Sequence, residues 1–598
     1  MSMSNPHVTL SGHSGHAIAA LTEGPEQGVP VLLAHGGGQT KRAWKRVTAM
    51  LADHGFRTIA LDLRGHGDSD ARFDTYGDLE TAGDVVALIG TLGGPAVVIG
   101  NPGPGGANML AGLTSAQGEG HPVVAIACTR RASVNSPDRG GAWQATDLVD
   151  MARPITSYSA LISRADRVPD MVRSAFRAAT VGRPGPAFLA IPDELLTQPV
   201  DLDAAALTPA GRHRVIDVGA GDPTRIADAA DLLAGAQRPF LFAGKGVLWA
   251  EASAAFVALG DHLGAAMSTT LGARGAVPED HPHYFTIADG NTLRAVRGDA
   301  DVVLVVGARL GEYDGWGVPP AWGDSEDQRT IQIDSDPMSI GLNRPVDLAV
   351  VADARGALEA LLAAVAERVE ARPGLEGAER YAAIHEQSVA EATPHVLAEP
   401  IVGVNPGQMV MALRELFPRD AVTVADGGNT TLWAVALNPV YVPDSFLYSV
   451  KMGYLGTGLP FAIGAKLAAP ERDVYLISGD GAFGFNAMEL ETARRVGAPV
   501  ICVVAVDGGW GMERTAHRFM GVPDDEAHGT DLSPEVRYDE LARALGCHGE
   551  HVTAMDELAP AIERARSSGL PAVLHVEVDP DINANPIGYE QFRSARTY

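Results

Sequence analysis

Residues 473–506 contain two short apolar runs joined by a helical stretch, and this unit constrains the fold more than any other part of the chain. The runs at residues 473–478 and 499–506 are rich in Val and Ile and have the length of buried strands. The stretch at residues 486–496 has the apolar spacing of a helix. Because a helical crossover returns the chain to the same side of a sheet, the two strands should be parallel.

Each of these two predicted strands leads into an aspartate. Asp480 lies between Gly479 and Gly481, and Asp507 is followed by Gly508 and Gly509. Side chains at the carboxyl ends of parallel strands face the crevice where such sheets bind ligands. Two carboxylates suit a hard cation such as Mg²⁺, which usually brings phosphate groups with it. Because glycines also let the backbone approach a phosphate, we expect a metal-bound diphosphate at this edge.

The same alternation of apolar runs, helical stretches and glycines continues along the chain and divides it into three blocks. We expect residues 1–200, 215–369 and 406–590 to form three consecutive doubly wound parallel-sheet α/β domains. A linker is expected at residues 201–214, a last central helix at 354–369, and a polar connection from 371 to about 406. The other predicted strands are residues 29–34, 57–63, 96–100, 123–128, 187–191, 239–243, 301–307, 330–333, 348–351, 421–425 and 572–578.

Composition narrows the function class. A net charge of −28 on 598 residues argues against a general partner of nucleic acid or of an anionic membrane. The three cysteines are widely separated and read as core thiols of a reducing compartment, not as a disulfide framework. The first residues lack the pattern of a secretory signal, and no apolar run is long enough to span a bilayer. We therefore expect a cytoplasmic protein.

Residues from about 101 to 590 resemble the thiamine diphosphate-dependent decarboxylases and carboligases, and among these the acetolactate synthases. The third block resembles the diphosphate-binding domain of that family, because Asp480 between two glycines and the later Asp507 match its metal motif. The resemblance implies that Asp480, Asp507 and the Gly509 carbonyl ligate Mg²⁺. The family usually has two Asn, or Asn and Asp, where this chain has Val506 and Asp507. Aspartate is an equally acceptable hard-oxygen ligand.

Other segments of the third block match the parts of the family that hold the cofactor. The segment around Gly428 would offer backbone N–H groups to phosphate. The Gly453 carbonyl would accept from the cofactor's 4′-amino group, and Leu455 would force the bent form in which that group can reach the reactive C2 proton. The expected cofactor-binding residues are Gly428, Asn429, Thr430, Gly453, Leu455, Gly479, Asp480, Gly481, Ala482, Asp507, Gly509, Trp510 and Gly511.

The second block resembles the family's central domain. The resemblance is carried by residues 239–247, residues 269–278 and the Gly-Ala-Arg sequence ending at Arg309. In acetolactate synthases this domain carries FAD, whereas other relatives have lost it or bind a different nucleotide. FAD is therefore one expected ligand, and a scaffold domain without a nucleotide is the competing interpretation.

The first block combines two resemblances. Residues 101–195 resemble the family's pyrimidine-binding domain, where Gln144 occupies a position that often lies near the substrate; a structural turn residue is the alternative. Residues 7–100 resemble the opening of an α/β-hydrolase, with a His-Gly-Gly sequence beginning at His35. The strand at residues 96–100 should then lead to a serine nucleophile. Because Pro102 occupies the expected position, we expect no hydrolase chemistry.

The first block also lacks an activating group that most of the family carries. That group is a glutamate after the second strand, and it hydrogen-bonds N1′ of the cofactor. Residues 62–70 contain aspartates but no glutamate. Relatives such as glyoxylate carboligase work without it. His35 stands where some relatives, such as benzaldehyde lyase, have a substrate-facing histidine, with a loop-stabilising role as the alternative.

These features predict a thiamine diphosphate- and Mg²⁺-dependent 2-oxoacid decarboxylase or carboligase that resembles acetolactate synthase. His35 and Gln144 are the candidate catalytic residues, and 2-oxoacids or aldehydes are the expected substrates. The family's site lies between two subunits, which implies a homodimer or homotetramer. One alternative is a cofactor-binding protein with weak or no turnover, and a weaker one is a hydrolase-type esterase.

Overall fold

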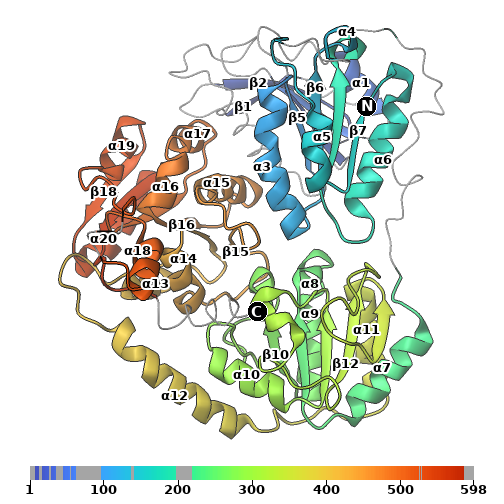
Figure 1. Cartoon of the computed structure of the whole chain (residues 1–598), viewed down its shortest axis with the longest axis vertical. Coiled ribbons are helices and arrows are strands. Elements are labelled where there is room, and N and C mark those ends of the chain that lie inside the picture. The colour runs from blue at the N-terminus through green and yellow to red at the C-terminus, as the bar shows by residue number, and fades with distance from the viewer. Residues whose placement is uncertain are drawn as a thin grey trace.

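The computed structural model describes residues 7–11, 17–25, 29–34, 45–53, 56–61, 96–135, 141–196, 199, 219–523, 526 and 528–584. Figure 1 shows three α/β bodies along the chain, with the first in blue and teal, the central one in green and the C-terminal one in orange and red. No helix in the described part of the chain combines the length and apolarity needed to cross a bilayer.

The C-terminal body is a six-stranded sheet with strand order β15-β14-β16-β17-β19-β18, and all its pairs are parallel. Alternate residues of each strand enter two different cores, so that Tyr475 and Ile477 pack on one face and Leu476 on the other. Its strands are β14 (Val422–Asp426), β15 (Phe446–Leu447), β16 (Val474–Gly479), β17 (Ile501–Val506), β18 (His548–Val552) and β19 (Ala572–Glu577).

Helices cover both faces of this sheet, as a doubly wound fold requires. The helix predicted at residues 486–496 corresponds to α17, and a second short helix, α16, which was not predicted, precedes it. The helices are α13 (Pro406–Leu416), α14 (Asn429–Leu437), α15 (Gly458–Ala468), α16 (Asp480–Asn486), α17 (Glu489–Arg495), α18 (Gly511–Phe519), α19 (Tyr538–Ala544) and α20 (Met555–Ser568).

The central body is a five-stranded parallel sheet with order β10-β9-β11-β12-β13. Four of its strands were predicted, and β10 was not. The elements are β9 (Pro239–Ala243), β10 (Ala266–Thr269), β11 (Val302–Val306), β12 (Arg329–Asp334), β13 (Leu348–Val351), α7 (Pro223–Gly235), α8 (Lys245–Trp249), α9 (Ser253–Leu263), α10 (Gly290–Asp299) and α11 (Ala354–Ala366).

The connection between the central and C-terminal bodies contains a long helix, α12 (Ala378–Val396), which the sequence interpretation treated as polar chain. This helix docks on α10, as Figure 1 shows. Tyr381 is 3% exposed and its hydroxyl donates to Asp299, while His385 bonds Asp289. The sequence did not reveal this helix, because its few apolar residues give only a weak helical periodicity and the residues on which it packs are far away in the sequence.

The first body contains two sheets. Residues 96–192 form a four-stranded parallel sheet with order β5-β6-β8-β7. Its elements are β5 (Ala96–Gly100), β6 (Val123–Thr129), β7 (Tyr158–Leu161), β8 (Ala187–Pro192), α3 (Pro104–Glu119), α4 (Ala132–Asn135), α5 (Leu148–Ala152) and α6 (Val168–Thr180).

The other sheet of the first body is mixed, and here the structure departs from the predicted parallel arrangement. Its order is β1-β2-β4-β3, with β2 antiparallel to both β1 and β4. The strand β3 also lies beside β5, although no ladder joins the two sheets within the described residues. The elements are β1 (His7–Ser11), β2 (Ala17–Glu23), β3 (Val29–Ala34), β4 (Phe56–Leu61) and α1 (Lys45–Asp53).

Candidate cofactor site

The two aspartates lie together at the carboxyl edge of the C-terminal sheet. Asp480 is the first residue of α16 and Asp507 directly follows β17, the parallel neighbour of β16. The Gly508 N–H donates to Asp480 Oδ2 over 2.9 Å, and the Gly509 N–H donates to Asp507 Oδ1 over 3.0 Å. The strand–helix–strand pattern therefore places both carboxylates at one edge.

Burial makes this pair of carboxylates costly in the absence of a cation. Asp480 is 3% exposed, and burial, followed by the charge of Asp507, raises its pKa to about 7. Burial also raises the pKa of Asp507. Backbone N–H groups and Arg514 act in the opposite direction. A hard divalent cation between the two side chains would relieve both burial and repulsion, so the donor set fits Mg²⁺.

Two helix N-termini open onto the same edge. The N-cap residues are Gly428 for α14 and Trp510 for α18, and neither helix has a side-chain cap. They lie close together, because a Cβ added at Gly428 would be 2.8 Å from Met512 Cβ. A Cβ at Gly479 would be 3.2 Å from the Thr430 hydroxyl. Uncapped N–H groups and the positive end of the helix dipole together suit a diphosphate.

Close backbone packing explains why glycines surround the aspartates. A Cβ on Gly481 would come within 2.8 Å of the Trp510 ring, and one on Gly511 would collide with the Asp507 carboxylate. Ala482 is 3% exposed, and Phe485 lies against Trp510 with ring centroids 6.0 Å apart. The indole of Trp510 therefore forms one wall beside the metal-ligand candidates.

The segment that contains Gly453 and Leu455 is tied to the same edge. Gly453 has a positive φ of 58°, and Leu455 is half-buried. The Gly456 carbonyl accepts from the Asn486 side chain over 2.7 Å, and the Gly458 N–H donates to Asp426 Oδ2 over 2.7 Å. These bonds fix the segment between β14 and α16.

The side chain of Asn429 forms hydrogen bonds to residues near the end of the described chain. Its Nδ2 donates to Asn583 Oδ1 over 3.0 Å, and its Oδ1 accepts from the Ala584 N–H over 2.9 Å. Asn429 thus ties the end of the described chain to the start of α14. Its expected contribution to the cofactor therefore rests on its backbone.

Two residues near the aspartates were missed by sequence reasoning. The Arg514 guanidinium donates to the carbonyls of Asp507 and Gly508 over 3.1 and 2.7 Å. The Tyr538 hydroxyl donates to the Asp480 carbonyl over 3.0 Å. Arg514 lies one helical turn beyond the motif and could have been suspected from spacing. Tyr538 comes from α19, and no local pattern indicates its position.

Of the two catalytic candidates, His35 lies outside the described residues, as do residues 62–70. Gln144 has a positive φ of 56° and packs against Gly103, where an added Cβ would be 3.0 Å from Gln144 Cα. Gly103 follows β5 and has φ 66° and ψ −104°. The strained backbone position in this strand-to-helix turn is therefore Gly103, not Pro102, and neither residue carries a nucleophile.

The two ends of α3 separate Gln144 from the cofactor edge of the same chain. Gly103 and Gln144 lie at the N-terminus of this 16-residue helix. At its C-terminus, Glu119 Oε1 accepts from the Lys451 N–H over 2.7 Å. Sixteen helical residues span about 24 Å. One chain alone therefore does not bring Gln144 together with Gly453 and Leu455.

The central sheet presents basic side chains at the carboxyl ends of its strands. Lys245 follows β9 and Arg309 follows β11, while Arg183 approaches from the first body. Burial, and then the charge of Arg309, lower the pKa of Arg183. At the end of β12, burial raises the pKa of Asp334 to about 6. Neighbouring guanidinium groups at this edge favour an anionic ligand.

Comparison with protein families gives four matches along the chain. Residues 82–151, 226–361 and 426–576 match the N-terminal TPP binding, central and C-terminal TPP binding domains of thiamine pyrophosphate enzymes. Residues 29–101 match the alpha/beta hydrolase fold. Both resemblances expected from the sequence are thus confirmed, and they overlap around β5.

Individual relatives extend over most of the chain. A probable acetolactate synthase from Mycobacterium bovis is 32% identical over 501 residues, which cover 82% of this chain and 85% of the relative. A 2-hydroxyacyl-CoA lyase from Oryza sativa subsp. japonica is 29% identical over 90% of this chain and 95% of its own length. The large subunit of acetolactate synthase isozyme 2 from Escherichia coli is 28% identical over 84% of this chain and 88% of its own length. The chain belongs to the family of thiamine pyrophosphate enzymes.

Proposed function

We propose that this protein is a thiamine diphosphate- and Mg²⁺-dependent 2-oxoacid decarboxylase or carboligase of the acetolactate synthase type. The observation that carries the proposal is the pair formed by the buried Asp480 and the half-buried Asp507 beside two uncapped helix N-termini. Asp480, Asp507 and the Gly509 carbonyl would hold Mg²⁺, and the first turns of α14 and α18 would bind the diphosphate. When bound, thiamine diphosphate supplies the carbanion chemistry that releases CO₂ and transfers an acyl group.

The chain's other residues would orient the cofactor and keep water away. The Gly453 carbonyl would hold the 4′-amino group, and Leu455 would support the bend between the two rings. The family membership and the relatives named acetolactate synthase and 2-hydroxyacyl-CoA lyase support small 2-oxoacids or aldehydes as substrates. The absence of nucleic acid and membrane partners, and a cytoplasmic location, form part of the proposal and rest on the charge and composition.

The test is turnover by the purified protein with pyruvate, thiamine diphosphate and Mg²⁺, followed as CO₂ release with and without an aldehyde acceptor. Asp480→Asn should abolish release, whereas Asp556→Asn, an exposed change in the same body, should not. Release that is equal in the native protein and in Asp480→Asn would contradict the proposal.

A second candidate is a protein that binds the cofactor with little or no turnover. The observation that favours it is the lack of a glutamate in residues 62–70. The rate at which the C2 proton of bound cofactor exchanges with D₂O, followed by NMR, separates the two candidates. Exchange far faster than in free cofactor supports catalysis, and exchange at the free rate supports binding alone.

Esterase activity is the weakest candidate, although residues 29–101 match the hydrolase fold. Pro102 and Gly103 offer no nucleophile at the turn after β5. A serine-directed fluorophosphonate should therefore not label the protein. Labelling that maps to a serine in this segment would revive the hydrolase candidate.

We also propose a homodimer or homotetramer, which the family resemblance implies and which the separation of Gln144 from the cofactor edge by the length of α3 supports. In an assembly, the first body of one copy can cover the cofactor edge of another. Sedimentation should show at least a dimer. Subunits that carry Asp480→Asn can be mixed with subunits inactivated in the first body, and the mixture should regain part of the activity. A native protein that is monomeric and fully active would contradict a site shared between two subunits.

The central body is proposed to bind an anionic nucleotide such as FAD at the edge that contains Lys245 and Arg309. The proposal is supported by the neighbouring Arg183 and Arg309, and by the buried Asp334. Flavin absorbance in the purified protein, or saturable binding of FAD or ADP that weakens in Arg309→Ala, would support it. A central domain that binds neither ligand would be a scaffold.

A further inference from the structure

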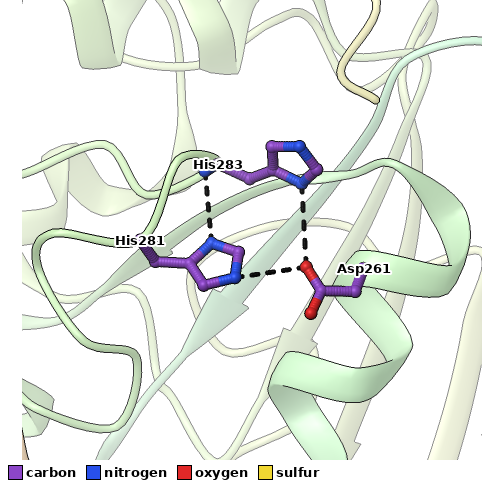
Figure 2. Close-up of side chains that lie close together, drawn as sticks. All are labelled: Asp261, His281 and His283. Carbon is purple, nitrogen blue, oxygen red and sulfur yellow. Dashed lines mark hydrogen bonds and ion pairs between the residues drawn. The ribbon is translucent and has the colours of Figure 1, made fainter. Parts of the chain in front are cut away.

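Away from the cofactor edge, two groups of three side chains in the described part of the chain could each hold a metal ion. One comprises Asp261, His281 and His283 on the central body, drawn in Figure 2. The other comprises His551, His575 and Glu577. In the second group, His575 Nδ1 already accepts from the Tyr538 N–H over 3.3 Å. In the group on the central body, the ring nitrogen Nδ1 of His283 makes no hydrogen bond to any described residue.

The distances in the first group match a compact metal site. His281 Nε2 and His283 Nδ1 lie 3.2 and 3.9 Å from Asp261 Oδ1. Figure 2 shows both rings directing a nitrogen toward this carboxylate. Zinc bound tetrahedrally at about 2.0–2.1 Å keeps neighbouring ligand atoms about 3.3 Å apart. Small movements would therefore bring all three atoms onto one ion.

Rigid local structure presents the two histidines. They lie in a tight turn in which the Tyr284 N–H donates to the His281 carbonyl over 2.9 Å. Pro282 occupies the second position of this turn, where its fixed φ is favoured. The His283 carbonyl accepts from the Met267 N–H of β10 over 2.8 Å. Because the sheet anchors the turn, little conformational freedom would be lost on binding a metal.

Two features of the group favour a cation. His283 Nδ1 is buried and has no hydrogen-bond partner within the described part of the chain. A neutral imidazole nitrogen is the form that ligates metals. Asp261 lies in the last turn of α9, where the helix dipole disfavours a carboxylate and favours a positive ion. Its side chain is 52% exposed, which leaves a path for entry.

We propose that Asp261, His281 and His283 bind a divalent transition-metal ion, with Zn²⁺ as the best fit to two imidazoles and one carboxylate. A water molecule would complete the tetrahedron. His281 Nδ1 accepts from the His283 N–H over 3.2 Å, which places the proton of the neutral ring on Nε2. Zinc binding at Nε2 would move that proton to Nδ1, which can then no longer accept from the His283 N–H, so the ring must turn slightly and this long hydrogen bond is exchanged for the metal bond.

The metal would hold in place residues 279–283 of the central body, a segment that contacts the C-terminal body. The same segment contains Glu279, which is paired with Arg274 and accepts from the Val440 N–H over 3.1 Å. Fixing His281 and His283 to α9 would hold Glu279 in place. Zinc should therefore raise the melting temperature of the native protein without being needed for turnover.

Calorimetric titration of Zn²⁺ into the full-length, tag-free protein in excess Mg²⁺ and thiamine diphosphate tests the site. We expect one strong site whose affinity falls about 100-fold or more in His281→Ala and His283→Ala, and about tenfold or more in Asp261→Asn. His385→Ala is the matched control, because its partner, Asp289, lies outside the proposed site. That variant and His551→Ala should bind zinc as the native protein does.

Cobalt provides an independent readout of the same site. Co²⁺ bound to the native protein should show the visible absorption of a four-coordinate ion, and His283→Ala should lose it. Gel filtration and circular dichroism establish that each variant is folded, and the near-isosteric Asp261→Asn keeps the test valid if a histidine variant does not fold. The proposal would be overturned if Asp261→Asn and a folded histidine variant both bound zinc with the affinity of the native protein. Loss of zinc binding in His551→Ala, or no zinc binding by the native protein, would also overturn it.

Discussion

The C-terminal and first bodies differ in how their sequence specifies them and in how they are attached. In the C-terminal body, one parallel sheet places the candidate ligands Asp480 and Asp507 at one edge. The first body contains a mixed sheet beside a parallel one, and its candidate Gln144 lies at the end of α3 that is remote from the cofactor edge of its own chain. Local motifs can thus specify the proposed anchor for the cofactor, whereas Gln144 would reach the cofactor only in the assembly proposed above.

The attachments of the two bodies show the same contrast. The central body holds the C-terminal body through Arg274 and Glu279, whose side chains are 1% and 4% exposed. Arg274 also donates to the Asn438 carbonyl over 3.0 Å. The first body meets the others at Glu119, which lies 3.8 Å from the 26% exposed Lys245 side chain. At the first junction, a buried ion pair of the central body contacts the C-terminal body, whereas at the second the two charges lie farther apart and the Lys245 side chain is partly exposed.

Removing one carboxylate from each junction should give the largest difference. Glu279→Ala leaves the Arg274 guanidinium buried and unpaired, and should lower the free energy of unfolding by about 3–5 kcal/mol. Glu119→Ala should cost about 1 kcal/mol, because its partners can reach water. Denaturant melts of both variants measure the difference. Equal losses would show that the two junctions do not differ as described.

A smaller effect is expected inside the cofactor edge. In Gly481→Ala the new Cβ would be 2.8 Å from the Trp510 ring, so the indole must shift. Overpacking of this kind costs about 1–3 kcal/mol, and thiamine diphosphate affinity should fall by roughly tenfold. Gly484→Ala lies in the same helix with its nearest atom at 3.4 Å and should bind normally. Equal affinities of Gly481→Ala and Gly484→Ala for thiamine diphosphate would contradict the close packing of Gly481 against Trp510.

The smallest expected effect is on acid stability of the C-terminal body. His575 is 3% exposed, and burial lowers its pKa below 6.5. The unfolded chain therefore takes up the proton first, so stability should fall as the pH drops below 6.5. In His575→Asn, a side-chain oxygen can still accept from Tyr538, as His575 Nδ1 does over 3.3 Å.

The measurement is the melting temperature at pH 7 and pH 5. The decrease should be smaller in His575→Asn than in the native protein, while the exposed His385→Asn should behave as the native protein does. A larger decrease in melting temperature in His575→Asn than in the native protein would contradict the direction given for the His575 pKa shift.

The sequence predicted those parts of the fold that short-range patterns encode. The strands that end before Asp480 and Asp507 were recognised because each is an apolar run followed by glycine. The antiparallel pair β1 and β2 was missed, because the two strands are short and contain alanine and polar residues in place of a run of Val, Ile and Leu. Tyr538 and Arg274 act through contacts far away in the sequence, and no local spacing marks either of them.

The central claim is that Asp480 and Asp507 anchor a metal-bound diphosphate. Isothermal titration of thiamine diphosphate with Mg²⁺ into the native protein and into Asp480→Asn tests it most directly. We expect saturable, Mg²⁺-dependent binding by the native protein and an affinity at least about 100-fold weaker in the variant. No binding by the native protein, or unchanged binding in Asp480→Asn, would contradict the account.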